Sequence, residues 1–390
     1  MKSIVLALLA AVALSAATGC SDGESNDPSG DASTDTDTDT DTDADTESDT
    51  DADAGCPDLL EEACEADAGA VMQVYVSTDD LGVSRFVDLA DLALLAETIW
   101  GGTALFVTGE DVVPDGENPQ WEAVDVSEAT AMQPVALADG FVVPDSAWVA
   151  LLCEGDNRTC SFWQASETTL TKMENGDVPT EGELRGATSL FDYSGGTPTA
   201  LCAFGDGLYC FDGTTWTTEI EAGTAPLFND FHCSMNDLGD YDRCVAVGDG
   251  GRRAIRASAA EEWVDGFSDT SEDLLSLSAM TSVAGGSGGI LYGLSAYDVA
   301  CSAVVGLSGE YDADPDTGTV KLAGVTRSGI LFYTRYDSSS GDFSSLECGG
   351  VVASGGALAV QRQFCGIMPN LLVLTKSALL SNRGWECAEE

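Results

Sequence analysis

The amino-acid sequence predicts an all-β fold built from repeated units, and three observations support this prediction. Short β-branched and aromatic runs alternate with Gly, Asp, Asn and Ser, as strands joined by turns do. Apolar runs that end in, or pass through, a small residue recur every 40 to 50 residues or so, on the order of a propeller repeat. They lie at 105–109, 149–155, 201–205, 245–248, 290–293, 330–334 and 371–375. A tryptophan follows most of these runs.

Units of roughly 40–50 residues with several short strands each predict a β-propeller. The clearest units are 202–216 (CAFGDGLYCFDGTTW) and 244–263 (CVAVGDGGRRAIRASAAEEW). We predict seven blades, with six or eight as alternatives, and a pair of β-sandwiches is the rival fold. The units near Gly293 and Thr334 lack the tryptophan, so the register of the repeat stays open there.

These units resemble the β-propeller repeats of bacterial secreted proteins with an Ile-Trp-Gly, Val-Gly-Asp-x-Gly and Asp-Gly-x-x-Trp consensus. Ile99-Trp100-Gly101 carries the first part, and the two units quoted above carry the others. Such repeats are similar to those of neuraminidase-type and photosystem-assembly-factor propellers. The resemblance implies a propeller over about 85–390 and is strong in three units.

The last repeat is too short to complete a blade, so we expect the ring to be closed by strands from both ends of the domain. Residues 71–77 and 83–88 are strand-like and precede the first repeat. Pairing them with 371–388 would remove the exposed sheet edges. The stretch 88–99 is rich in Leu and Ala and is the one place where a helix is expected within the repeats.

The N-terminus has the pattern of a secretory signal. Lys2 is followed by an apolar run at 4–17, too short for a bilayer, which needs roughly 20 residues. Small residues at 16–19 precede Cys20, and this resembles the lipobox of bacterial lipoproteins, with Ala17 where that family usually has Leu. The resemblance implies cleavage at 1–19, acylation of Cys20 and sorting to the outer membrane, on its periplasmic side or the cell surface. An ordinary signal followed by a stray cysteine is the alternative.

Residues 20–55 are expected to be a disordered tether. Positions 21–55 hold 14 acids, no Lys or Arg, no aromatic residue, and no apolar residue larger than Ala apart from Pro28. Such a segment buries too little surface to offset the entropy of ordering. We therefore assign 1–19 to the signal, 20–55 to the linker and 56–390 to the propeller, which begins with a short helix near Pro57.

The formal charge of −52 excludes direct nucleic-acid binding and contact with anionic lipid headgroups. We expect the lipid anchor to be the sole membrane contact and the protein to be a monomer. A specific cationic partner is the alternative to a merely solvated surface.

The cysteines predict an oxidising compartment. Without Cys20, twelve of the 13 remain, enough for a disulfide framework. Cys202 and Cys210 flank a turn at Asp206 and would face each other on two strands. Other pairs suggested by proximity are Cys56–Cys64, Cys153–Cys160 and Cys233–Cys244. Four cysteines allow three connectivities, although Cys365–Cys387 could lock the closing blade: Cys301, Cys348, Cys365 and Cys387.

No catalytic constellation stands out. His232 is the sole histidine and occupies the place of Trp100 in another repeat, which favours a structural role. Arg252, Arg253 and Arg256 would be split over two faces of a strand. The turn-like 248–251 lacks the lysine of a phosphate loop. No cofactor is expected, apart from a weak calcium candidate whose alternative is a hairpin loop: Asp312, Asp314 and Asp316.

These observations favour a non-enzymatic, surface-anchored module that binds a protein or glycan. The alternative is an extracytoplasmic hydrolase or lyase that uses carboxylates at the channel mouth, with an Arg or Tyr beside them. A structural role in envelope assembly is the third hypothesis.

Overall fold

The computed structural model describes Leu60, Cys64 and residues 72–381, apart from 91–92, 109–119, 140–147, 156–158, 167, 193–196, 224–225, 236–240, 259, 279–280, 301, 312–318, 345, 352–355 and 366–367. The chain divides into two units, Met1–Ala52 and Asp53–Glu390, and every described residue belongs to the second. The predicted signal, Cys20 and the linker 20–55 lie outside the described residues, as do Cys56, Cys301, Cys387 and the calcium candidate at 312–316. No helix among the described residues is long and apolar enough to cross a bilayer.

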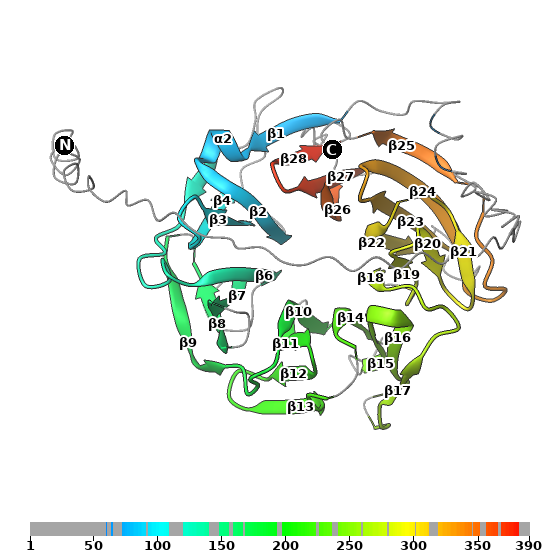
Figure 1. The fold of residues 1–390 in the computed structure, drawn as a ribbon, viewed down its shortest axis with the longest axis horizontal. Helices are drawn as coiled ribbons and strands as arrows, with labels where there is room; N and C mark the ends of the chain where they lie inside the picture. The colour runs from blue at the N-terminus through cyan, green and yellow to red at the C-terminus, as the bar shows by residue number, and fades with distance from the viewer. Residues whose placement is uncertain are drawn as a thin grey trace, which may run out of the picture. The chain divides into compact units, whose positions relative to one another are not determined.

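Seven four-stranded antiparallel sheets form the blades of a propeller (Figure 1). Blade 1 contains β2 (Val83–Ala90), β3 (Ala93–Thr98), β4 (Thr103–Thr108) and β5 (Trp121–Ala123). Blade 2 contains β6 (Gln133–Asp139), β7 (Trp148–Glu154), β8 (Thr159–Ala165) and β9 (Leu170–Asp177). Blade 3 contains β10 (Leu184–Asp192), β11 (Thr197–Gly205), β12 (Leu208–Phe211) and β13 (Trp216–Ile220).

The remaining blades follow the same order. Blade 4 contains β14 (Phe228–Met235), β15 (Tyr241–Gly248), β16 (Arg252–Arg256) and β17 (Val264–Phe267). Blade 5 contains β18 (Leu274–Leu277), β19 (Ala284–Gly286), β20 (Ile290–Tyr292) and β21 (Ala296–Asp298). Blade 6 contains β22 (Val304–Tyr311), β23 (Thr319–Thr326), β24 (Ile330–Asp337) and β25 (Glu347–Val351). Blade 7 contains β26 (Ala357–Cys365), β27 (Met368–Thr375), β28 (Ala378–Ser381) and β1 (Gln73–Ser77).

The blades pack side by side in a ring. The first strand of each blade contacts the first strand of the next, and β26 returns to β2. Buried apolar side chains form seven clusters, one between each pair of adjacent blades. Each sheet therefore buries both faces, which is how a radial arrangement replaces a single central core. The predicted seven-bladed propeller is confirmed.

The ring is closed by strands from both ends of the domain. β1 pairs antiparallel with β28, placing Val76 opposite Leu379. The prediction that 71–77 supplies a closing strand is confirmed. The same prediction for 83–88 is wrong, because this segment is the first strand of blade 1. Helix α2 (Thr78–Leu81) separates the two strands, and Gly82 ends it at φ 67, a left-handed conformation that glycine adopts without strain.

The helix expected at 88–99 is also wrong, because this stretch ends β2 and forms β3. All four residues from Ala93 to Ala96 are buried, since neighbouring blades cover both faces of the sheet. A strand buried on both faces loses the alternation that distinguishes it from a helix.

The Gly-Asp pair that recurs at 205–206 and 248–249 lies in the turn after the second strand of its blade. In both blades this turn packs closely against the residue that precedes the first strand. The N–H of Asp206 donates to the Glu183 carbonyl, and that of Asp249 to the Leu227 carbonyl, both at 2.9 Å. A Cβ on Gly248 would lie 2.0 Å from the Leu227 oxygen. The turn after the second strand is thus fastened to the residue that precedes the first strand, and only glycine fits there.

The seven apolar runs used to recognise the repeat do not all occupy the same strand of their blade, and three of them differ from the others. The runs at 105–109, 290–293 and 330–334 lie on third strands, whereas 201–205 and 245–248 lie on second strands. Trp121 and Trp216 begin fourth strands, but Trp163 lies buried inside the third strand β8. Second and third strands are both buried apolar runs, so the sequence alone did not separate them.

Among the described residues, three disulfides join neighbouring strands, and these are pairs expected from spacing. They link Cys153–Cys160, Cys202–Cys210 and Cys233–Cys244, with Cα–Cα distances of 4.0, 4.1 and 3.9 Å. A fourth joins Cys64 to Cys348 on β25, so the expected Cys56–Cys64 pair is wrong.

The physical reason is tertiary packing of the N-terminal segment. Leu60 and Cys64 are both helical and lie one turn apart, hence on the same face. Leu60 is fully buried in the cluster between blades 5 and 6, and its N–H reaches the Val299 carbonyl at 3.2 Å. This packing points Cys64 at blade 6. The side chain of Cys365 lies outside the described part of the structure.

Candidate ligand-binding site

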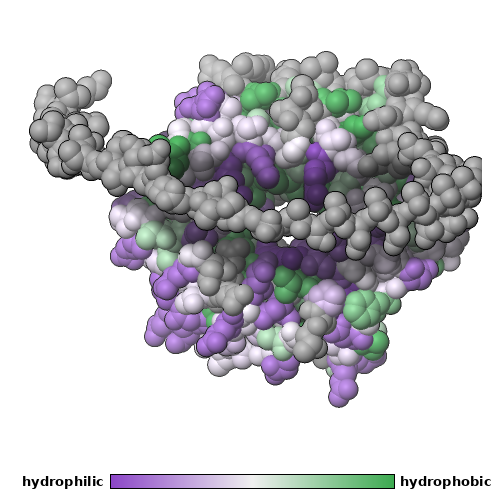
Figure 2. All heavy atoms as spheres, in the orientation of Figure 1, coloured by the Kyte–Doolittle hydropathy of each residue, from purple (hydrophilic) through white to green (hydrophobic). Residues whose placement is uncertain are grey.

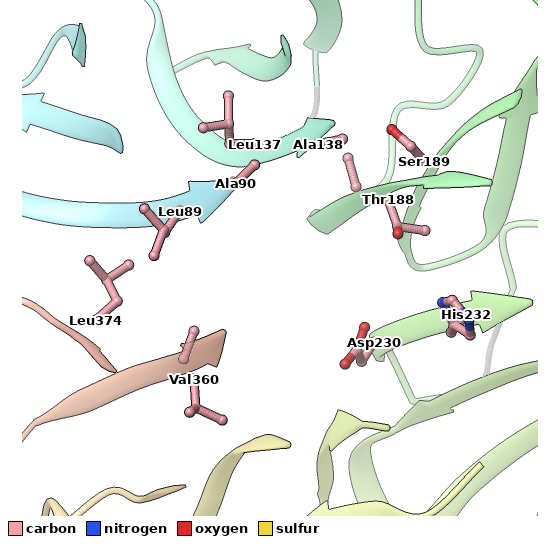
Figure 3. Close-up of a pocket in the computed structure, with 12 residues that line it drawn as sticks. Leu89, Ala90, Leu137, Ala138, Thr188, Ser189, Asp230, His232, Val360 and Leu374 are labelled. Carbon is pink, nitrogen blue, oxygen red and sulfur yellow. The ribbon is translucent and has the colours of Figure 1, made fainter. Parts of the chain in front are cut away.

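A cavity of about 380 Å³ lies where the first strands converge on the ring axis (Figure 3). Blades 1, 2, 3, 4 and 7 supply its walls. The lining residues are Leu89, Ala90, Leu137, Ala138, Ala187, Thr188, Ser189, Asp230, His232, Ala359, Val360 and Leu374. A volume of several hundred Å³ is in the range of small-ligand sites.

The cavity has an apolar half and a polar half. Leu89, Leu137 and Leu374 lie on one side of the view in Figure 3. Thr188 and Ser189 of blade 3 lie on the other side, with Asp230 and His232 of blade 4. A ligand in this space would therefore meet hydrocarbon at one end and hydrogen-bonding groups at the other.

Strand periodicity places Asp230 and His232 in the cavity wall. Phe231 and Cys233 point into the apolar cluster between blades 3 and 4, so their neighbours on β14 face the opposite way. The sequence comparison that set His232 in the place of Trp100 is wrong. Trp100 lies in the turn between β3 and β4 and is 89% exposed, whereas His232 lies on a first strand. The alternation of buried residues around 230–233 is the signal that could have placed it.

The Asp230 carboxylate binds two main-chain donors. It accepts hydrogen bonds from the N–H of Phe231 and from the N–H of Leu277 in blade 5, both at 2.7 Å. Burial is the main cause that raises the pKa of Asp230 to about 7; the negative charge of Asp88 adds to the rise, and the two N–H groups oppose it. Part of the side chain stays accessible through the cavity. Asp230 can therefore change its charge near neutral pH.

His232 offers an imidazole without an internal partner. Among the described residues, no hydrogen bond or ion pair to its ring is found. Burial lowers the pKa of His232 to about 4, so the ring is neutral at physiological pH. A neutral imidazole has one donor and one acceptor nitrogen, and both remain available to a ligand in the cavity.

Asp88 lies within electrostatic range of Asp230 and makes the equivalent contacts in blade 1. Its carboxylate accepts from the N–H of Leu89 and from the N–H of Leu137 in blade 2, both at 2.8 Å. The enzyme hypothesis expects buried acids with an Arg or Tyr among them. The two acids are present, but both bind main-chain N–H groups, and none of the twelve lining residues named above is Arg or Tyr.

The three arginines of β16 are split over two faces, as the strand pattern predicts. Arg252 is 2% exposed, stacks on Phe228 and pairs with Asp265 at 2.8 Å. Arg253 faces the other way and lies over Tyr292 of blade 5. No anion-binding arginine cluster results.

The stretch 248–251 is a turn between β15 and β16 that contains the 3-10 helix η1 (Asp249–Gly251). Within the described ranges, no group of three potential metal ligands occurs.

The described residues of the outer surface include single exposed apolar side chains, such as Trp100, Val264 and Phe267. Hydrophobic residues form small separate spots between polar ones on the face seen in Figure 2. Trp100 is the most exposed large apolar side chain in the described part of the chain. Its turn is well fixed, because Thr98 Oγ1 accepts hydrogen bonds from the N–H groups of Trp100 and Gly102 at 3.4 and 3.0 Å.

No protein-family model and no curated protein matches this sequence. Solved structures do match the fold. YCF48 from Cyanidioschyzon merolae has a TM-score of 0.49 and 12% identity, covering 80% of this chain and 98% of that one. YCF48 bound to D1 peptide has a TM-score of 0.50 and 13% identity, covering 80% and 95%. BBS1N in complex with ARL6DN has a TM-score of 0.47 and 13% identity, covering 80% and 96%.

The chain is a seven-bladed β-propeller. The likeness to these structures concerns the fold alone, because the identities are too low to carry residue roles across. Its blade order and the closure between its chain ends are observed in this chain, and its axial cavity is defined by its own side chains.

Proposed function

We propose that the propeller is a binding module for a segment of another protein, which inserts one side chain into the axial cavity. The observation that carries this proposal is the cavity itself, where hydrocarbon faces the Asp230 carboxyl and the unpartnered His232 imidazole. A volume of about 380 Å³ suits one side chain or a small ligand. Walls that come from five rigid blades preorganise the site, which lowers the entropic cost of binding.

The comparison with solved propellers supports a protein ligand. One YCF48 structure has a D1 peptide bound to it, so a protein of this fold holds a peptide. For the present chain, the strongly acidic composition favours a partner of opposite charge, since complementary potentials guide association.

We further propose that the module is displayed on a lipid anchor. Acylation of Cys20 would hold it at the bacterial outer membrane, and the linker 20–55 would separate the ring from the bilayer. At about 3.3–3.6 Å per residue its fully extended length is on the order of 120 Å. The lipid would be the sole membrane contact, with the propeller acting as a monomer. Metabolic labelling with a fatty acid, compared between the wild type and Cys20→Ala, tests this part.

The binding proposal is tested by filling the cavity. Thr188→Phe places a ring inside it, and Thr217→Phe places the same ring on exposed β13 of the same blade. Peptides would be selected from a random displayed library on the wild-type chain. We expect at least a tenfold loss of affinity in Thr188→Phe and none in Thr217→Phe.

Failure to select any peptide, or equal binding by both folded variants, would refute the proposal. Folding of each variant is checked by circular dichroism. Turnover of glycosides or esters by the purified chain would support the hydrolase hypothesis instead.

A further inference from the structure

The charge around the axial cavity has one sign. Its lining holds one carboxyl group, Asp230, and no Lys or Arg. Asp88 adds a second negative charge close enough to raise the pKa of Asp230. The whole chain carries −52. Low-dielectric walls concentrate such a field, so the cavity favours a cation over an anion.

Among the described side chains, neighbouring elements bring no cation to the cavity; the side chain of Arg362 on β26 lies outside the described part of the structure. On β10, Arg185 lies at the start of the strand and binds Asp249 at 2.8 Å, outside the lining residues. Strand β18 carries no ionisable residue. Arg243 lies near the start of β15, is exposed, and is not one of the lining residues. Among the described residues, no positive charge neutralises Asp230.

The division of the cavity matches a particular shape of ligand. Lysine and arginine have a hydrocarbon stem and a cationic head, and they bury the stem against apolar surface. The leucines at 89, 137 and 374 would contact the stem, and the polar wall would receive the head. Each Asp230 oxygen has a second lone pair beyond the main-chain bond, so the carboxylate can accept from an ammonium or guanidinium group.

We infer that the axial cavity is a subsite for one cationic side chain, lysine or arginine, whose charged head pairs with Asp230 and donates to His232. This inference rests on the proposed binding of a protein segment and names the chemistry of its inserted residue. Two ligands alone do not make a metal site, and the described residues contain no group of three that could hold a metal ion.

Binding of the cation displaces a proton. When Asp230 is protonated, the neutral carboxyl loses H⁺ to solvent as the cation pairs with the resulting carboxylate, so charge balances. The pKa of about 7 then makes affinity rise with pH and level off above neutrality. Between pH 5.5 and 8 the ionised fraction increases roughly 30-fold, and the apparent affinity should rise by a similar factor.

The sole histidine makes the site observable by NMR. We would titrate the full mature chain with n-butylamine and follow the Cε1–H resonance of His232. The control ligand is 1-butanol, which has the same stem without the charge. We expect a saturable shift with the amine, at least tenfold weaker binding of the alcohol, and tighter amine binding at pH 8 than at pH 5.5. Equal binding of alcohol and amine, or a pH-independent amine affinity, would overturn the inference.

Two variants locate the effect. Asp230→Asn should abolish amine binding. Asp212→Asn also loses main-chain contacts, to the N–H groups of Thr214 and Thr215, but Asp212 lies outside the lining residues, and this variant should retain amine binding. A shift that persists in folded Asp230→Asn contradicts the inference. If Asp230→Asn does not fold, the comparison of amine with alcohol on the wild type decides alone.

The two proposals fail separately. If selected peptides occupy the cavity through neutral anchors and the amine does not bind, the cationic subsite is wrong and the binding module stands. If the amine binds as described but no peptide is selected, the cation site stands and the proposed partner class is wrong.

Discussion

Asp88 and Asp230 make equivalent pairs of hydrogen bonds in blades 1 and 4. Each carboxylate accepts the N–H of the following residue and an N–H from the first strand of the next blade, on Leu137 and Leu277 respectively. Both residues follow a register shift in their strand pairing, and such bulges redirect side chains. The two acids thus fasten adjacent blades near the axis, but only Asp230 lines the cavity.

Asp230 and His232 should give opposite pH dependences of stability. The raised pKa of Asp230 means that the folded state holds its proton more tightly, so its contribution is present at low pH and lost between about 4 and 7. The lowered pKa of His232 makes unfolding take up a proton, so stability rises from about pH 4 to 6.5. The two effects oppose each other in the wild type.

Single variants should therefore separate them. In His232→Gln, stability falls as pH rises from 4.5 to 6.5, and in Asp230→Asn it rises. Each slope is at most about 1.4 kcal/mol per pH unit, and smaller because cavity water screens the charges. Urea unfolding midpoints at three pH values measure this. Slopes of the same sign in both variants would contradict the assignment.

The Cys64–Cys348 bridge should be the most stabilising disulfide described. It closes a loop of 284 residues, against 8 for Cys202–Cys210. Loop entropy then gives about 5.6 kcal/mol for the first and about 2.5 kcal/mol for the second. Chemical unfolding of the two paired Cys→Ser variants compares them. Peptide mapping under non-reducing conditions gives the connectivity, and a Cys56–Cys64 peptide would refute the bridge.

Closure of the ring should depend on the inner face of β1. Val76 is 3% exposed and Val74 on the same strand is 53% exposed. Val76→Asp buries an unpaired carboxylate between blades 7 and 1, and should cost more than about 3 kcal/mol. Val74→Asp is the matched control and should change stability by less than about 0.5 kcal/mol. Similar melting temperatures for the two variants would contradict the burial of Val76 between blades 7 and 1, and with it the closure of the ring by β1.

Replacing Gly248, the glycine before Asp249 in the repeat, by alanine should destabilise the fold. Gly248→Ala would force the Leu227 carbonyl away from a contact of 2.0 Å and should cost about 2–3 kcal/mol, as overpacking does. Gly266 on β17 has no neighbour within 4 Å, so Gly266→Ala is the control and should be nearly neutral. Thermal unfolding of both variants measures the difference. A stable Gly248→Ala protein would argue against the packing explanation of the repeat.

Arg252 is expected to contribute more than its neighbours on β16. It donates to the Pro226 carbonyl at 2.6 Å and to Asp265 through two nitrogens. Arg252→Ala leaves those acceptors without a donor and should cost about 3 kcal/mol, since breaking a buried pair is expensive and Asp265 is partly solvated. Arg252→Lys should recover part of the loss. No difference between the Ala variant and the wild type in urea would exclude this role.

By itself, the sequence determined the features that depend on local pattern. The repeat period and the strand-turn alternation indicated the propeller, and the spacing around Asp206 indicated the Cys202–Cys210 pair. The strand-like 71–77 indicated how the ring closes. Each of these follows from side-chain periodicity or from chain connectivity over a few residues, and both are visible in one dimension.

Only the tertiary structure decided what distant segments do to one another. It joined Cys64 to Cys348, placed His232 in the axial wall rather than in the position of Trp100, and brought Asp88 within electrostatic range of Asp230. It also showed β3 to be a strand, since burial on both faces had removed its alternation. The candidate site is made of single residues from five blades, and their proximity depends on ring closure, which no local pattern encodes.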